Sequence, residues 1–180
     1  KLVWLFGLPM ATCLAIFSEP LLIVVYSRPE FIEVAPAFAI YSFFVVTYMA
    51  GMVSFSVYLA IARPGIQRRF TIVRAVLAVA ALCPFILLMG TTGAALALLV
   101  SLVVAMVTQL FSLRRVIGLP IASYLKLMLP GIAVACIAVV PSLGVRLFLA
   151  LPNWGQVAVG AGIGGVLWGV LAVFEGRDLR

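Results

Sequence analysis

Two groups of polar residues lie where this chain is otherwise almost entirely apolar, and they are its first candidates for chemistry. Glu19 stands in the stretch AIFSEPLLIVVY, directly before Pro20. An ionised carboxylate within a membrane costs on the order of a few kcal/mol, so it has to face a protein interior, pair or carry a proton. Two interpretations stay open. Ser18, Glu19 and Pro20 resemble a helix restart with a capping residue ahead of proline, or Glu19 is a functional carboxylate that senses protons or cations in a polar cavity.

The second group is a row of small and hydroxyl-bearing residues. Thr47, Gly51, Ser54 and Tyr58 follow one another at spacings of four, three and four residues. These spacings place them on one face of an α-helix. Such a face is poorly suited to lipid, so it predicts either hydrogen bonding to a neighbouring helix or the lining of a wet cavity. In the second case these four residues and Glu19 are transport-cavity candidates.

Four arginines follow in and just after the loop RPGIQRR, namely Arg63, Arg68, Arg69 and Arg74. Arginine suits phosphate oxygens because its planar guanidinium donates parallel hydrogen bonds. These residues are therefore candidates for contact with a phosphate or a lipid headgroup. The alternative is that they fix membrane orientation and meet anionic headgroups only in general.

Glycines near the end of the chain are candidates for helix packing. In QVAVGAGIGGVLWG, Gly160 and Gly164 form one GxxxG pattern, and Gly165 and Gly169 form another. Small residues let two helix backbones approach closely in lipid. We expect them to pack within one bundle, with a dimer interface as the alternative.

The residue types that most catalytic and metal sites require are missing. The sequence has no His, and its three cysteines, Cys13, Cys83 and Cys136, lie in apolar runs, where cysteine behaves as a small hydrophobe. We therefore expect no metal, no cofactor and no catalytic residue. Glu30 and Glu33 form an acidic pair that leaves an interfacial enzyme as an alternative.

The composition indicates a membrane protein. Of the 180 residues, 66% are hydrophobic and 9% are charged, and the mean hydropathy is +1.33. A soluble domain carries roughly 25% charged residues, so this chain lacks the polar surface that a soluble globule needs. The net charge of +7 is explained by basic loops that orient the chain in the membrane, without nucleic acid as a partner.

Six stretches are long enough to cross a bilayer, which takes about 20 apolar residues. Short loops with Gly, Pro or charge separate them, so the predicted fold is all-α, a single integral membrane bundle of six transmembrane helices. Because the chain begins at Lys1 and not at methionine, we expect it to be a piece of a longer protein. The predicted spans are residues 2–26, 34–62, 70–89, 94–113, 127–151 and 156–174.

The basic residues divide unequally between the two sides of this topology. Arg28 and Arg146 lie on one side, and ten lie on the other: Lys1, Arg63, Arg68, Arg69, Arg74, Arg114, Arg115, Lys126, Arg177 and Arg180. Cytoplasmic loops carry the excess of Lys and Arg. We therefore expect both ends of the segment to be cytoplasmic.

The order of several motifs resembles a known family of transporters. EPLLIVVYSRPEF followed by VAPAFAIYSF is similar to the seventh and eighth helices of polysaccharide flippases. These flippases form the O-antigen and exopolysaccharide branch of the multidrug/oligosaccharidyl-lipid/polysaccharide exporter superfamily. YLAIARPGIQRR resembles the family's basic cytoplasmic loop, and MGTTGAALALLVS resembles its outer turn. The matching positions are Pro20, Leu21, Val25, Tyr26, Phe31, Ala35, Pro36, Gly90, Gly93 and Ala94, while Ser27 stands where the family usually has Gly.

This resemblance covers most of residues 2–120 and implies the C-terminal half of a two-bundle flippase. In such a protein the two bundles rock around a central cavity. They carry an undecaprenyl-pyrophosphate-linked saccharide across the bacterial inner membrane for polysaccharide biosynthesis. The implied partners are membrane lipid, this lipid-linked oligosaccharide and an N-terminal helical bundle of the same protein. The first two spans would line the cavity, and the related lipid II flippases also have an acid before the proline.

Three alternatives remain beside this one. The chain could belong to a lipid II flippase or a multidrug exporter of the same superfamily, since a fold does not settle a substrate. It could be a membrane scaffold subunit that pairs through Gly164 and its neighbours. The third alternative is the interfacial enzyme, which would depend on Glu30 or Glu33.

Overall fold

The computed structural model describes residues 2–118, 120–148 and 152–178, and all regular structure in these ranges is helical. The predicted all-α class is thereby confirmed. The elements are α1 (Leu2–Ile16), α2 (Ser18–Tyr26), the 3-10 helix η1 (Pro29–Val34), α3 (Ala35–Ala60), α4 (Pro64–Ile117), α5 (Ile121–Phe148) and α6 (Asn153–Asp178).

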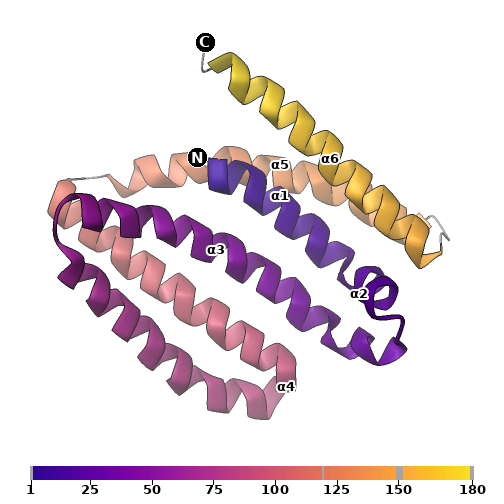
Figure 1. Ribbon diagram of the computed structural model, residues 1–180, viewed down its shortest axis with the longest axis horizontal. Helices are drawn as coiled ribbons and strands as arrows, with labels where there is room; N and C mark the ends of the chain where they lie inside the picture. The colour runs from indigo at the N-terminus through magenta and orange to yellow at the C-terminus, as the bar shows by residue number, and fades with distance from the viewer. Residues whose placement is uncertain (1, 119, 149–151, 179–180) are drawn as a thin grey trace.

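The helices lie side by side in a layered array (Figure 1). Helix α1 is central, because it packs against α5 on one side and against α3 on the other. Helix α3 in turn packs against α4, which forms one edge of the array. Helix α6 covers α1, α2 and α5 at the opposite edge. The short loops predict that sequential helices are antiparallel neighbours, and this holds except for α4 and α5, which have only slight contact.

Helix α4 folds back on itself at Gly90 and forms two antiparallel limbs (Figure 1). The backbone of Gly90 has φ 59° and ψ −134°, a conformation that is open to glycine and costly for residues with a Cβ. Three residues later the limbs begin to pack, and a Cβ on Gly93 would lie 1.9 Å from the carbonyl oxygen of Phe85. The sequence GTTG therefore forms the turn between the predicted spans 70–89 and 94–113.

Several helices are long and apolar enough to cross a membrane, which marks the chain as a membrane protein. Within the described residues, three meet this criterion, namely Pro29–Ala60, Pro64–Ile117 and Ile121–Arg146. The bent pair α1 and α2 would be a fourth if it is one span. Helices occupy all six predicted ranges, except that residues 149–151 of the fifth lie outside the described part. The count of six spans stays a prediction.

The loops gather at two opposite ends of the array (Figure 1). The turns from α3 to α4 and from α4 to α5 lie at one end, and η1, the Gly90 turn and the start of α6 lie at the other. Arg63, Arg114 and Arg115 belong to the first end, whereas Arg28 belongs to the second. Lys1 and Arg180 lie outside the described residues. The cytoplasmic assignment of the first end stays a prediction.

The closest helix approaches involve glycines, although mainly not the predicted ones. A Cβ on Gly131 of α5 would lie 2.3 Å from the backbone oxygen of Trp4 in α1. Among the predicted packing glycines, Gly160 approaches the ring of Phe17, at 2.7 Å for such a Cβ. Around Gly164, Gly165 and Gly169, a Cβ would meet no described atom within 4 Å. Of the four glycines predicted to pack, only Gly160 makes a close contact within the described residues. The sequence pattern did not identify Gly131.

Gly131→Ala is expected to lower the free energy of unfolding by about 1–3 kcal/mol, because the added methyl group forces α5 away from the α1 backbone. Gly144→Ala is the matched control on the same helix, since a Cβ there meets nothing within 4 Å. Thermal unfolding of both variants in detergent measures the difference. Equal stability of the two variants would contradict the close approach of α1 and α5.

Candidate functional site

The chain breaks between α1 and α2, directly before Glu19. Phe17 has φ −96° and ψ 16° at this point, and the two helices are bent by 70°. The sequence places the restart correctly but assigns its cap wrongly. Ser18 is the first residue of α2, Phe17 occupies the cap position, and no side chain caps the helix. Pro20 is therefore the third residue of α2 instead of the first.

Pro20 leaves a backbone acceptor without its normal donor. In a continuous α-helix, the carbonyl of residue i accepts a hydrogen bond from the N–H of residue i+4, and for Ile16 that residue is Pro20. Proline has no N–H. The guanidinium of Arg146, from α5, supplies the missing donor, since its Nη1 donates to the carbonyl oxygen of Ile16 at 2.7 Å.

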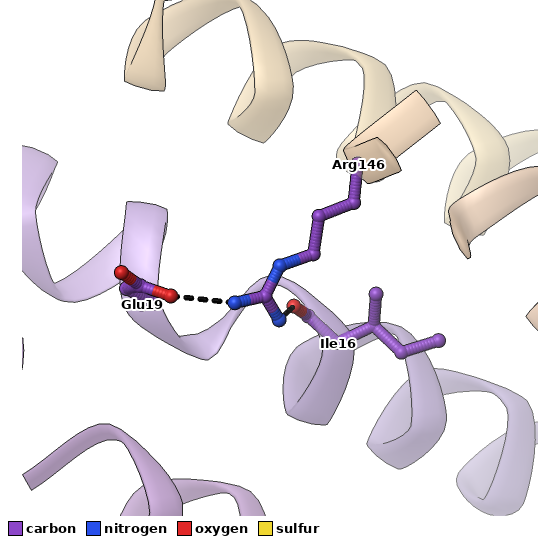
Figure 2. A network of polar contacts seen from close by, with 3 residues as sticks. All are labelled: Ile16, Glu19 and Arg146. Atoms are coloured by element: carbon purple, nitrogen blue, oxygen red, sulfur yellow. Dashed lines mark hydrogen bonds and ion pairs between the residues drawn. The ribbon is translucent and has the colours of Figure 1, made fainter. Parts of the chain in front are cut away.

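The same guanidinium pairs with Glu19, as Figure 2 shows. Arg146 Nη2 donates to Oε2 of Glu19 at 2.5 Å, which makes a charge-assisted hydrogen bond. Both side chains are only partly buried, with 36% of Arg146 and 40% of Glu19 exposed. One arginine thus bridges a carboxylate and a backbone carbonyl on either side of the helix break. The carboxylate at Glu19 is paired within the chain.

Sequence analysis missed the role of Arg146 and counted it only toward membrane orientation. A signal was present, because Arg146 falls inside the predicted span 127–151, near the same end of the bundle as Glu19. Opposite charges inside spans are expected to pair. A comparison of the depths of Glu19 and Arg146 in their predicted spans could therefore have predicted the pair.

The polar face of α3 turns mainly toward protein. Tyr58 is fully buried, and its hydroxyl donates to the backbone oxygen of Gln109 in α4 at 3.2 Å. The hydroxyl of Thr47 is buried and donates within its own helix, to the carbonyl oxygen of Phe43 at 2.8 Å. Ser54 is also buried. These contacts favour the interhelical interpretation for Tyr58, whereas the proposed transport role of the face stays untested.

A cleft of about 250 Å³ lies between α3 and the two limbs of α4. Of the predicted cavity residues, Gly51 lines this cleft, whereas Glu19, Thr47, Ser54 and Tyr58 are not among its lining residues. Of the predicted phosphate contacts, Arg74 lines it, whereas Arg63, Arg68 and Arg69 are exposed outside it. The polar lining residues are Tyr48, Gln67, Thr71, Arg74 and Gln109.

Four polar groups of the cleft form two contact pairs. The guanidinium carbon of Arg74 lies 5.6 Å from the centre of the Tyr48 ring, a cation–π contact. Across the cleft, Nε2 of Gln109 donates to Oε1 of Gln67 at 2.7 Å. The lining contains one full positive charge and no carboxylate. It is therefore suited to an anion and not to a metal cation, and no group of three or more His, Cys, Asp or Glu side chains gathers within the described ranges.

Comparison of the chain with protein-family models, with curated proteins and with solved structures finds no match in any of the three. The flippase family therefore remains a resemblance of motifs, and the two sites described above are argued from their own geometry.

Arg146→Met is expected to lower the free energy of unfolding by about 1–3 kcal/mol, because Glu19 and the Ile16 carbonyl both lose their partner. Pro20→Ala returns an N–H to the position that can bond this carbonyl. In the Pro20→Ala background, the cost of Arg146→Met should therefore fall by about 0.5–1.5 kcal/mol, the net value of one hydrogen bond. Thermal unfolding of the four variants of this cycle measures the coupling.

Pro9→Ala supplies the matched control, because Pro9 lies inside α1, away from Arg146. Distant substitutions add, so the cost of Arg146→Met should be unchanged by Pro9→Ala. If Arg146→Met costs the same with and without Pro20→Ala, then Arg146 does not replace the hydrogen-bond donor that the proline lacks.

Proposed function

We propose that this chain is the C-terminal half of a polysaccharide flippase. Such a protein moves an undecaprenyl-pyrophosphate-linked saccharide across the bacterial inner membrane by alternating access. It transports the molecule without changing it chemically. The observation that carries the proposal is the interrupted helix α1–α2, where a carboxylate and a proline coincide with a 70° bend. Transporters of this kind commonly place broken helices at their sites.

The bridge formed by Arg146 gives the α1–α2 junction a way to change its arrangement. Glu19 and Arg146 remain partly exposed, so water, a cation or a substrate group can reach the pair. A competing ion that binds one partner releases the other, and the Ile16 carbonyl loses its donor at the same time. A helix junction held by one side chain is thus able to occupy two arrangements, which alternating access requires.

The layered arrangement is also compatible with a half-transporter. Helices α1, α2 and α3, which the family resemblance assigns to the cavity, are contiguous. An N-terminal bundle of the same protein would supply the opposing wall, and the lipid-linked oligosaccharide would enter between them. Lipid II and drug substrates remain the rival cargoes, and complementation with each substrate-specific strain separates them.

Glu19→Gln is expected to reduce polysaccharide export about tenfold, which corresponds to about 1.4 kcal/mol on the limiting step. The amide keeps an oxygen that can accept a hydrogen bond from Arg146, so the fold should persist while the charge is lost. The measurement is surface polysaccharide in a flippase-deficient strain that expresses the full-length protein, with membrane insertion checked by immunoblot.

Glu30→Gln serves as the matched control, because Glu30 is exposed in η1. It should export as the wild type does. Normal export by an inserted Glu19→Gln protein would remove Glu19 from the mechanism. Loss of export in the Glu30 variant instead would favour chemistry at the acidic pair of η1.

A further inference from the structure

Arg74 is held unusually deep for an arginine near a helix start. It lies ten residues after Pro64, the first residue of α4, which is about 15 Å along the helix. Its contact partner Tyr48 lies twelve residues before the end of α3 at Ala60, about 18 Å from that end. Long cationic side chains near helix ends normally extend outward to the interface. The guanidinium of Arg74 instead meets a ring at about its own depth.

Among the residues that line the cleft around this charge, the structure places no carboxylate. The chain contains five acidic residues. Glu19 pairs with Arg146, and Glu30 and Glu33 lie in η1, at the other end of the array. Glu175 and Asp178 belong to the end of α6, which packs on α1, α2 and α5. Intramembrane charges are expected to find a partner. Because the described lining of the cleft holds no carboxylate, the space beside Arg74 is suited to an anionic ligand.

The amides that line the cleft together with Arg74 are oriented by a network that reaches into the core. The buried Tyr58 hydroxyl donates to the backbone oxygen of Gln109, and the Gln109 side chain donates to Oε1 of Gln67. With its oxygen engaged, the Gln67 amide presents its N–H groups as donors. The guanidinium, the Gln67 amide and the Tyr48 hydroxyl thus offer several donors around one space, a preorganised arrangement that lowers the cost of binding.

The dimensions of the cleft limit the ligand to a small group. Sites for drug-sized molecules measure about 300–1,000 Å³, and this cleft has about 250 Å³. Its apolar walls include Met52, Phe55 and Leu102. The cleft is therefore able to hold an anionic headgroup while attached hydrocarbon remains outside in the membrane.

We propose that the cleft between α3 and α4 binds the phosphate group of a membrane phospholipid, with Arg74 as the principal contact. Phosphate fits because a guanidinium donates two parallel hydrogen bonds to its oxygens. The site requires only a membrane location, so it goes beyond the proposed transport function and would persist if that function failed. The same chemistry would accept free phosphate, and the experiment below separates the two sources.

The test is a lipid titration of the purified, delipidated full-length protein, read by native mass spectrometry. Wild type should bind one phosphatidylglycerol about tenfold more tightly than diacylglycerol with the same acyl chains, because only the first offers phosphate. Arg74→Gln should remove this preference. Arg69→Gln is the matched control, since Arg69 is an exposed arginine of the same helix that does not line the cleft, and it should keep the preference.

Titration with inorganic phosphate forms the second arm. Displacement of phosphatidylglycerol by phosphate in wild type, but no phosphate binding in Arg74→Gln, would support the assigned site. Phosphate binding that depends on Arg74, without any preference for phosphatidylglycerol over diacylglycerol, would overturn the lipid as the source. Equal retention of both lipids together with no binding of phosphate would overturn the site itself.

A third variant keeps the test decisive if Arg74→Gln fails to fold. Arg74→Lys retains the charge and loses the paired geometry of the guanidinium, so it should fold and bind phosphatidylglycerol several-fold more weakly than wild type. Unchanged binding in Arg74→Lys would show that the paired geometry is not used, which would overturn the role of Arg74.

Discussion

The structure depends on one constraint, which is that backbone polar groups inside a membrane need partners within the protein. A proline in a spanning helix violates this constraint locally, because it removes a donor. At Pro20 the chain compensates with a side chain from another helix, and Arg146 bonds the carbonyl that the proline leaves without a donor. The break between α1 and α2 is thus tied to the position of α5 through Arg146.

The same constraint explains how α3 tolerates its hydroxyl groups. Ser42 donates to the carbonyl oxygen of Phe38, and Thr47 donates to that of Phe43, in each case one turn back along the helix. Local bonds of this kind satisfy a hydroxyl without any neighbour. A hydroxyl in an apolar span is therefore a weak sign of a cavity. Tyr58 differs, because its longer side chain reaches α4, and it fixes the relation of the two helices.

Sequence patterns predicted the helices better than the contacts between them. Hydropathy and loop residues placed a helix in each of the six predicted ranges, because span length and breaks are local properties. They missed the 3-10 helix η1, which lies between the first two predicted spans. The close approach of α5 to α1 escaped prediction, since Gly131 is isolated and the GxxxG pattern points to residues 160–169. Glu19 was identified as an anomaly from composition alone. Its partner Arg146 lies 127 residues away in sequence, and only the packing of α1 on α5 brings the two together. The cleft between α3 and α4 was not predicted. Gly51 and Arg74 were expected at different sites, a transport cavity and a phosphate contact. Gln67 and Gln109 meet only because the two limbs of the α4 hairpin pack together.

The two polar centres are joined to different parts of the array. Helix α1 is fixed to α5 at both of its ends, by the Trp4 indole donating to the Tyr124 hydroxyl at 3.2 Å and by the bridge from Arg146 to Ile16. These two contacts fix the register of α1 against α5. The cleft belongs to α3 and α4, and α4 has only slight contact with α5. Displacement of the α4 hairpin would open the cleft without disturbing the Glu19 pair. Coupling between the two centres has two routes. One is the packing of α3 on α1, where Val46 and Ala50 meet Trp4 and Ala11. The other is Tyr124 of α5, which packs against the cluster formed by Tyr58, Leu110 and Leu113.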